Sequence, residues 1–236
     1  MPDQTAYIQV QTADGAFGAY LAIPATPSSV AVVVLQEIFG VNSNIRATVD
    51  RFAEAGYAAI APDLYWRLAP GIELDPGSEA GRARAMELLP QLRHDQAIAD
   101  GAAALAALRD RVPALDRSAA VGYCFGGGVA FLMATRGVVD AGIAYYGTGL
   151  DKMLGELDAL DGRLLLHIAA DDHVCPPPAQ AAIAAAVAEK APDRAEVLVH
   201  PGVGHAFARL GGATYDAAAA ARADARTMTL LESLPG

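Results

Sequence analysis

The sequence predicts a doubly wound α/β fold, in which helices cover both faces of a mostly parallel sheet. Short apolar runs of strand length alternate with helix-forming segments along the 236 residues, which is the pattern of repeated β-α-β units. The run Val30–Leu35 is apolar throughout, as expected of a strand buried on both faces. Asp14 and Gly15 form a turn-prone pair between two further β-like runs, so the chain is expected to open with an antiparallel hairpin.

The expected elements follow from these signals in chain order. The hairpin strands are expected at residues 7–11 and 17–23. After residues 30–35, Asn44 is expected to cap a helix at residues 45–55 that stops at Gly56. Residues 64–77 are interrupted by prolines and glycines and are expected to form an irregular surface excursion. Further strands are expected at residues 57–61, 119–122, 141–146, 164–169 and 195–199. Further helices are expected at residues 78–89, 92–109, 129–135, 179–190 and 215–233.

The composition favours one well-buried domain. Hydrophobic residues make up 53% of the chain and charged residues 19%, the opposite of a disordered sequence. The length suits a single α/β domain, so one domain over residues 1–236 is expected. The formal net charge is −10, which repels phosphate backbones and anionic membrane surfaces. Neither nucleic acid nor a membrane is therefore expected as a partner.

The chain reads as a cytoplasmic protein. Its first residues lack the basic start and apolar stretch of a signal peptide. No run reaches the roughly 18 apolar residues of a membrane span. The two cysteines, Cys124 and Cys175, are expected to stay thiols in a reducing compartment.

Cys124 lies in the sharpest local pattern. An apolar strand runs into Gly122-Tyr-Cys-Phe-Gly126, and a helix follows, which is the nucleophile-elbow pattern with cysteine as the nucleophile. The glycines are expected because larger side chains would collide in so tight a turn. The helix N-terminus favours a thiolate, and the N–H of Phe125 is a candidate oxyanion donor. The alternative is that Cys124 is a small buried hydrophobe beside an ordinary turn.

Two later residues complete a candidate catalytic set in the chain order of α/β-hydrolases, which is nucleophile, acid, histidine. Asp172 follows an apolar strand and is preferred over Asp171, and His205 lies in a glycine-flanked loop after the last strand. A carboxylate bonded to one imidazole nitrogen leaves the other to take the thiol proton. The other histidines are expected to be exposed or satisfied in the core. No metal site is expected around His173 and Cys175, because no C-x-x-C or H-E-x-x-H spacing occurs.

Six segments along the chain together match a known family pattern. They are Gln36-Glu-Ile-Phe-Gly-Val-Asn42, Ala61-Pro-Asp-Leu-Tyr65, Gly122-Tyr-Cys-Phe-Gly-Gly127, Tyr145-Tyr-Gly147, Asp172-His173 and Gly204-His-Ala-Phe-Ala-Arg209. Through them the chain resembles the dienelactone hydrolases (carboxymethylenebutenolidases) over nearly its whole length. The resemblance implies a monomeric, cofactor-free enzyme of the α/β-hydrolase fold. It implies that this enzyme opens the lactone ring of dienelactone (4-carboxymethylenebut-2-en-4-olide) to maleylacetate in the breakdown of chlorinated aromatics.

The resemblance assigns the catalytic roles position by position. Cys124, Asp172 and His205 match a catalytic triad that forms a thioester acyl-enzyme, and Glu37 matches a carboxylate near the thiol. A carboxylate there raises the thiol pKa by repulsion or takes a hydrogen bond from it. Glu37 is therefore expected to act as a gate that keeps the resting thiol protected until the substrate carboxylate displaces it.

The resemblance also implies a binding site for a small anionic lactone. Arg82 and Arg209 match arginines that hold the substrate carboxylate, and arginine offers a planar, bidentate fork for such a group. Phe39 and Tyr146 are expected to line the substrate site. Ile38 is expected to supply a second oxyanion N–H.

Three positions depart from the family pattern. Ala206 stands where serine commonly follows the catalytic histidine, Phe125 where leucine commonly follows the nucleophile, and Met86 where an aromatic residue is common. One alternative function is therefore a broader carboxylesterase or thioesterase on the same scaffold. The alternative from another class is a noncatalytic ligand-binding or redox-sensing protein.

Overall fold

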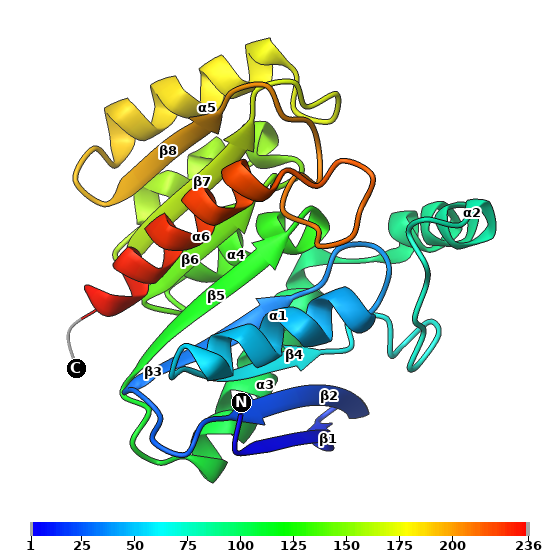
Figure 1. Ribbon diagram of the computed structural model, residues 1–236. Coiled ribbons are helices and arrows are strands. Elements are labelled where there is room, and N and C mark those ends of the chain that lie inside the picture. The colour runs from blue at the N-terminus through cyan, green and yellow to red at the C-terminus, as the bar shows by residue number, and fades with distance from the viewer. Residues whose placement is uncertain (1, 235–236) are drawn as a thin grey trace. The chain divides into compact units, whose positions relative to one another are not determined.

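The computed structural model describes residues 2–234 (Figure 1). They form two compact units, the first ending at Ser118 and the second beginning at Ala119. The expectation of a single domain stays a prediction.

The first unit is built on four strands in the order β1-β2-β4-β3. β1 (Gln4–Thr12) and β2 (Gly15–Ile23) form the predicted antiparallel hairpin, and β2 also pairs antiparallel with β4 (Ala58–Pro62). β3 (Val30–Leu35) lies parallel to β4. Every residue of β3 and β4 is buried, as expected of strands covered on both faces.

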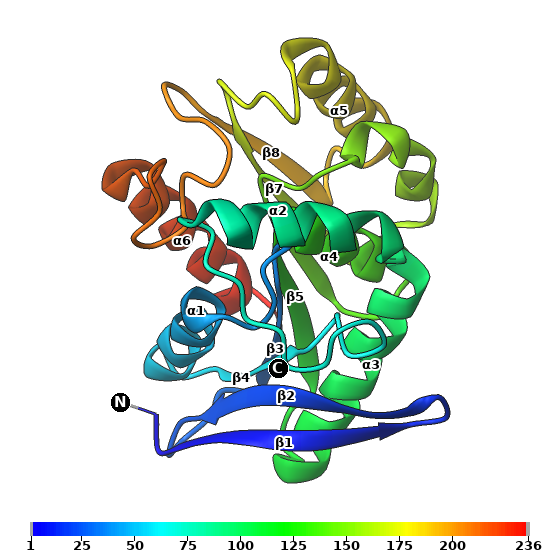
Figure 2. The same cartoon turned by 90° about the vertical axis from the view of Figure 1, so that its right-hand side faces the viewer.

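The helices of the first unit are α1 (Ser43–Glu54), α2 (Glu79–Leu88), the short 3-10 turn η1 (Leu89–Gln91) and α3 (His94–Arg111). Figure 2 shows α1 and α3 on opposite sides of the strands. The expected cap of α1 was wrong, because Asn42 and not Asn44 caps it. Asn42 has an extended backbone, and its Oδ1 accepts from the N–H of Ile45 at 3.2 Å, three residues on, as a helix cap requires.

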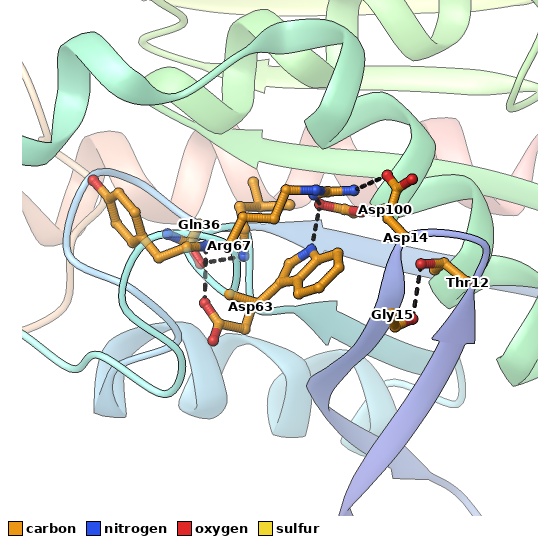
Figure 3. A network of polar contacts seen from close by, with 10 residues as sticks. Thr12, Asp14, Gly15, Gln36, Asp63, Arg67 and Asp100 are labelled. Atoms are coloured by element: carbon orange, nitrogen blue, oxygen red, sulfur yellow. Dashed lines mark hydrogen bonds and ion pairs between the residues drawn. The ribbon is translucent and has the colours of Figure 1, made fainter.

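The segment before α2 is irregular, as predicted, and is tied to its surroundings by side chains. The guanidinium of Arg67 donates to Asp100 on α3 at 2.7 Å and to Asp14 in the hairpin turn at 3.0 Å (Figure 3). Trp66 also donates its indole N–H to Asp100 at 3.0 Å. These contacts fasten the excursion to both the hairpin and α3.

The second unit holds four parallel strands in the order β5-β6-β7-β8. They are β5 (Arg117–Tyr123), β6 (Ala141–Tyr145), β7 (Arg163–Ala169) and β8 (Ala195–His200). Their helices are α4 (Phe125–Thr135), α5 (Pro177–Lys190) and α6 (Ala217–Glu232), with 3-10 segments η2 (Leu150–Lys152) and η3 (Leu154–Ala159). Figure 2 shows α4 and α5 on one side of these strands and α6 on the other.

As predicted, the helix that follows the elbow, α4, includes residues 129–135. The helix begins at Phe125, directly after Cys124, and includes three consecutive glycines, which have low helix propensity. Packing explains the middle one, since a Cβ on Gly127 would lie 2.7 Å from Cα of Gly147. The helix therefore tolerates a poor helix former at this position, because only glycine allows this close approach.

No helix within residues 2–234 combines the length and apolar character needed to cross a bilayer.

Candidate active site

Cys124 lies between β5 and α4 in a strained backbone conformation. Its φ is 53° and its ψ is −115°, a region that residues with a side chain rarely adopt and that tends to occur at functional sites. Its backbone groups are held on both sides. The N–H donates to the carbonyl of Tyr145 at 3.1 Å, and the carbonyl accepts from Gly127 at 3.0 Å and Thr148 at 3.1 Å. The thiol is therefore carried on a sharp, well-anchored turn.

Gly122 makes this turn possible. A Cβ added there would lie 1.9 Å from the carbonyl oxygen of Gly126 and 2.7 Å from the nitrogen of Gly127. Both are backbone atoms, so no side-chain movement would relieve the clash. The glycine two residues before Cys124 is thus required by the turn, as the sequence pattern predicted.

The structure brings Asp172 and His205 together. Asp172 follows β7, and its Oδ2 lies 2.8 Å from Nδ1 of His205. Its other oxygen accepts from the N–H of Val174 at 2.8 Å. Asp172 is buried, whereas Asp171 is exposed. The bond to Asp172 orients the imidazole and leaves Nε2 available for proton transfer.

The carboxyl of Asp172 is held in its ionised form. Burial opposes ionisation, but hydrogen bonds from His205 and from the backbone N–H groups of Val174 and Cys175 outweigh it. The net pKa of Asp172 therefore lies below its ordinary value. An ionised partner also stabilises the imidazolium that forms when His205 takes a proton.

Tyr145 and Tyr146 link the positions of Cys124 and His205. The carbonyl of Tyr145 accepts from the N–H of Cys124, and the ring of Tyr146 stands edge-on to the imidazole of His205, with centroids 5.1 Å apart. Tyr146 has a φ of 41°, so its placement is also strained. The loop of His205 is further held by Thr214, whose hydroxyl donates to the His205 carbonyl at 2.8 Å.

Phe125 and Arg209 are the other predicted site residues of the second unit. Phe125 is the first residue of α4, where N–H groups point out of the helix end. Arg209 is half-buried in the loop that follows His205. Nothing in the sequence pattern singles out Val174 or Thr214, because one acts through its backbone and the other through a common hydroxyl.

The remaining predicted residues belong to the first unit. Glu37, Ile38 and Phe39 follow β3 directly; Glu37 and Phe39 are buried. The carbonyl of Ile38 accepts from the hydroxyl of Tyr65 at 3.0 Å. Arg82 lies exposed on α2, and its guanidinium donates to two carbonyls of the preceding loop, at 3.0 and 2.8 Å.

Comparison with known proteins decides the family. The model of the dienelactone hydrolase family matches residues 17–234. This chain belongs to the dienelactone hydrolase family. It is 38% identical over 228 residues to the carboxymethylenebutenolidase of Pseudomonas putida, a match that covers 96% of each chain. It is also 38% identical to carboxymethylenebutenolidase 1 of Cupriavidus pinatubonensis, over 93% of each chain.

Solved structures of similar proteins share the fold. The dienelactone hydrolase from Anabaena variabilis is 19% identical with a TM-score of 0.67, and the match covers 98% of this chain and 99% of that one. A dienelactone hydrolase-like promiscuous phosphotriesterase from metagenomic libraries is 23% identical with a TM-score of 0.79, over 99% of each chain. The α/β-hydrolase fold and the family resemblance are thus confirmed, and the protein is a hydrolase.

In this member of the dienelactone hydrolase family, a buried polar network joins β6, β7 and β8 to α6. Nδ1 of His167 lies 3.1 Å from Nε2 of His200, and Nε2 of His167 lies 3.2 Å from the hydroxyl of Thr227. The hydroxyl of Tyr145 lies 2.8 Å from that of Thr227 and donates to Asp224 at 2.8 Å. His167 and His200 are thus satisfied in the core, one of the two outcomes expected for the histidines outside the triad.

The network makes stability depend on pH. Burial, with His200 and Arg226 adding to it, lowers the pKa of His167 from 6.5 to about 3. Between these values the unfolded chain takes up a proton that the folded chain does not, so acid favours unfolding. We expect His167 alone to remove about 2 kcal/mol from the free energy of unfolding between about pH 7 and about pH 5. Urea unfolding at both pH values measures this loss, and His167→Gln should show a correspondingly smaller one.

The matched control is His173→Gln, because His173 is exposed. This variant should keep the wild-type pH dependence. Equal losses of unfolding free energy in His167→Gln and in the wild type would show that His167 does not carry the effect.

Proposed function

We propose that this hydrolase opens the lactone ring of dienelactone and releases maleylacetate, using Cys124, His205 and Asp172 as a catalytic triad. The observation that carries the proposal is the 2.8 Å contact between His205 and the buried Asp172, which leaves one imidazole nitrogen to serve as a base. The 38% identity to carboxymethylenebutenolidases supports the choice of substrate.

Acyl transfer to sulfur is the first half of the reaction. His205 takes the thiol proton, and the sulfur of Cys124 attacks the lactone carbonyl. The backbone N–H groups of Phe125 and Ile38 stabilise the negative charge that forms on the carbonyl oxygen. The ring C–O bond then breaks, and the enolate oxygen takes the proton from His205. The enol stays on the opened acyl chain, whose carbonyl carbon is now bonded to sulfur as a thioester.

Hydrolysis of the thioester is the second half. Water attacks the acyl carbon while His205 takes its proton, and the C–S bond breaks. The carboxylic acid product leaves, and the proton returns to Cys124. The enol formed on the acyl chain in the first half becomes the ketone of maleylacetate by a proton shift from oxygen to carbon.

The surroundings of the two cysteines support Cys124 as the nucleophile. Cys124 stands at the N-cap of α4, where the helix dipole favours a negative charge. Burial, with the nearby charges of Asp172 and Asp151, raises the pKa of Cys175 to about 11. Cys175 therefore stays a thiol near neutral pH. A nucleophilic thiol needs a reducing compartment, which supports a cytoplasmic location.

The family resemblance supports the remaining roles. Glu37, with 1% of its surface exposed, is the carboxylate that keeps the resting thiol protonated until substrate displaces it. Arg82 and Arg209 bind the substrate carboxylate, while Phe39 and Tyr146 line the substrate site. Such a site takes a small anionic lactone as its partner.

Relative turnover of two esters tests the substrate proposal. We expect kcat/KM for dienelactone to exceed that for an aryl acetate by at least about 100-fold, because only dienelactone offers a carboxylate to the arginines. Steady-state kinetics on both substrates measures the ratio. An aryl acetate hydrolysed as well as dienelactone would instead favour a broader carboxylesterase. Serine is the common family residue at position 206. Comparing the two substrates in Ala206→Ser would then show whether the loss of this hydroxyl broadened the range of substrates.

A further inference from the structure

The first unit contains a pocket that none of the candidate site residues lines. Its volume is about 340 Å³. Tyr7, Gly18 and Tyr20 of the hairpin line one side, and Asp63, Trp66 and Ile72 of the segment after β4 line the other. The pocket therefore lies between the hairpin and the irregular excursion.

Gly18 keeps this pocket open. Alternate residues of a strand share a face, so Gly18 lies between Ala16 and Tyr20 on the same face of β2. The register pairs Gly18 with Gln9 and Tyr20 with Tyr7. A Cβ added to Gly18 would meet only the Gln9 side-chain nitrogen within 4 Å, at 3.9 Å. A small residue at this position thus leaves open space next to Tyr20 and Gln9.

The walls of the pocket are aromatic and held in place. The rings of Tyr7 and Tyr20 stand edge to face, with centroids 5.2 Å apart. The Tyr20 hydroxyl donates to Asp50 at 2.9 Å, and Arg46 donates to the Tyr7 hydroxyl at 3.0 Å. Ordered aromatic faces and edges favour flat rings and organic cations as ligands.

Asp63 gives the pocket a negative charge. Its side chain is buried, with one oxygen accepting from the N–H of Tyr65 at 2.9 Å and the other from Gly71 at 2.7 Å. Burial raises the pKa of this carboxyl, and the charged group that adds to the effect is another acid, Asp100. Within residues 2–234, no cationic side chain pairs with Asp63.

The cations near the pocket are engaged elsewhere. Arg46 pairs with Glu73, the other acid of the lining, at 2.6 Å. Arg67 pairs with Asp14 and Asp100 (Figure 3), and its guanidinium lies over the ring of Trp66, 4.1 Å from the centroid. The charge of Asp63 is therefore available to a cationic ligand, and a buried carboxylate gains most from a partner that also donates hydrogen bonds.

We propose that this pocket is a second binding site, and that it takes a small arylalkylammonium ion. The ring of the ligand packs against Tyr7, Tyr20 and Trp66, and its ammonium group donates to the carboxylate of Asp63. The site is separate in its residues from the proposed triad, so it binds its ligand whether or not the proposed lactone is the substrate.

Trp66 provides a direct measurement, because it is the single tryptophan of the chain and lines the pocket. Titration with 2-phenylethylammonium should change Trp66 fluorescence in a saturable way. The neutral analogue 2-phenylethanol should bind at least about tenfold more weakly, since it offers no charge to Asp63. The anionic analogue 3-phenylpropionate should give no saturable change. Equal affinity for the three probes, or no saturable change with the ammonium ion, would overturn the proposal.

A variant that fills the pocket tests the location. Gly18→Leu should weaken binding of 2-phenylethylammonium at least about tenfold by excluding the ring, whereas the matched control Gly18→Ala should retain binding. Ester hydrolysis should be unchanged in both. Ala16→Leu, on the same strand face and exposed, replaces Gly18→Leu if that variant does not fold. Binding at wild-type affinity in the folded pocket-filling variant would place the ligand elsewhere and refute this site.

Discussion

Replacing Cys124 with alanine is expected to lower kcat/KM for dienelactone by at least about 10⁴-fold, the usual cost of removing a catalytic nucleophile. Alanine keeps the Cβ of cysteine, so the strained turn at φ 53° changes little and only the sulfur is lost. Steady-state kinetics measures the activity, and circular dichroism with thermal unfolding shows that the fold is retained. Turnover that survives the substitution would remove the sulfur from the mechanism.

The other cysteine supplies the matched control. Cys175 is buried, and its pKa of about 11 keeps it protonated, so Cys175→Ala should hydrolyse dienelactone at close to the wild-type rate. Its backbone N–H, which helps to hold Asp172, is unaffected by the change. A burst of acyl-enzyme with an activated ester should appear in Cys175→Ala and be absent in Cys124→Ala. A noncatalytic binding protein would show no burst in either variant.

The Cys175→Ala variant also allows a test of the role proposed for Glu37. In a Cys175→Ala background, alkylation by iodoacetamide reports on Cys124 alone. If Glu37 protects the resting thiol, Glu37→Gln should speed alkylation, because an amide carries no charge to oppose the thiolate. Equal alkylation rates in the proteins with Glu37 and with Glu37→Gln would show that Glu37 does not protect the resting thiol.

Much of the fold could be predicted because buried strands and helix faces consist mainly of apolar residues, which are recognisable in the sequence. β3 (Val30–Leu35) matches its predicted bounds because a strand covered on both faces is apolar at every position. The start of α4 follows from the elbow pattern, but the glycine at position 127 is explained by the close approach of Gly147, a contact that the sequence does not reveal. The choice between Asn42 and Asn44 as a cap depends on backbone angles, which either asparagine can adopt.

In the candidate site, too, the features set by local sequence could be predicted, whereas those set by tertiary contacts could not. The elbow around Cys124 and the order of the acid and histidine follow from local patterns, so the sequence leads to Cys124, Asp172 and His205. The support around them is tertiary. The strained Tyr146 against His205 and the N–H of Val174 on Asp172 arise from packing between separate loops. No spacing in the sequence encodes such contacts, so only the folded chain reveals them.

The largest effect on stability is expected at Gly122, beside the nucleophile. Gly122→Ala should lower the free energy of unfolding by at least about 3 kcal/mol, because overpacking against immovable backbone is among the costliest single changes. The added Cβ would lie 1.9 Å from the carbonyl oxygen of Gly126, so the turn carrying Cys124 must open to admit it. Urea unfolding measures the loss, and hydrolysis by the folded fraction measures the displacement of the thiol.

Gly155→Ala is the matched control, since Gly155 is exposed in η3 and a Cβ there would meet nothing within 4 Å. Its free energy of unfolding should stay within about 0.5 kcal/mol of the wild type. If Gly122→Ala were equally stable, the turn would have room for a side chain, and the glycine would not be a requirement of the elbow. If Gly122→Ala were stable but inactive, the turn must have opened to admit the Cβ. The tight turn would then be needed to position the sulfur of Cys124 and not for stability.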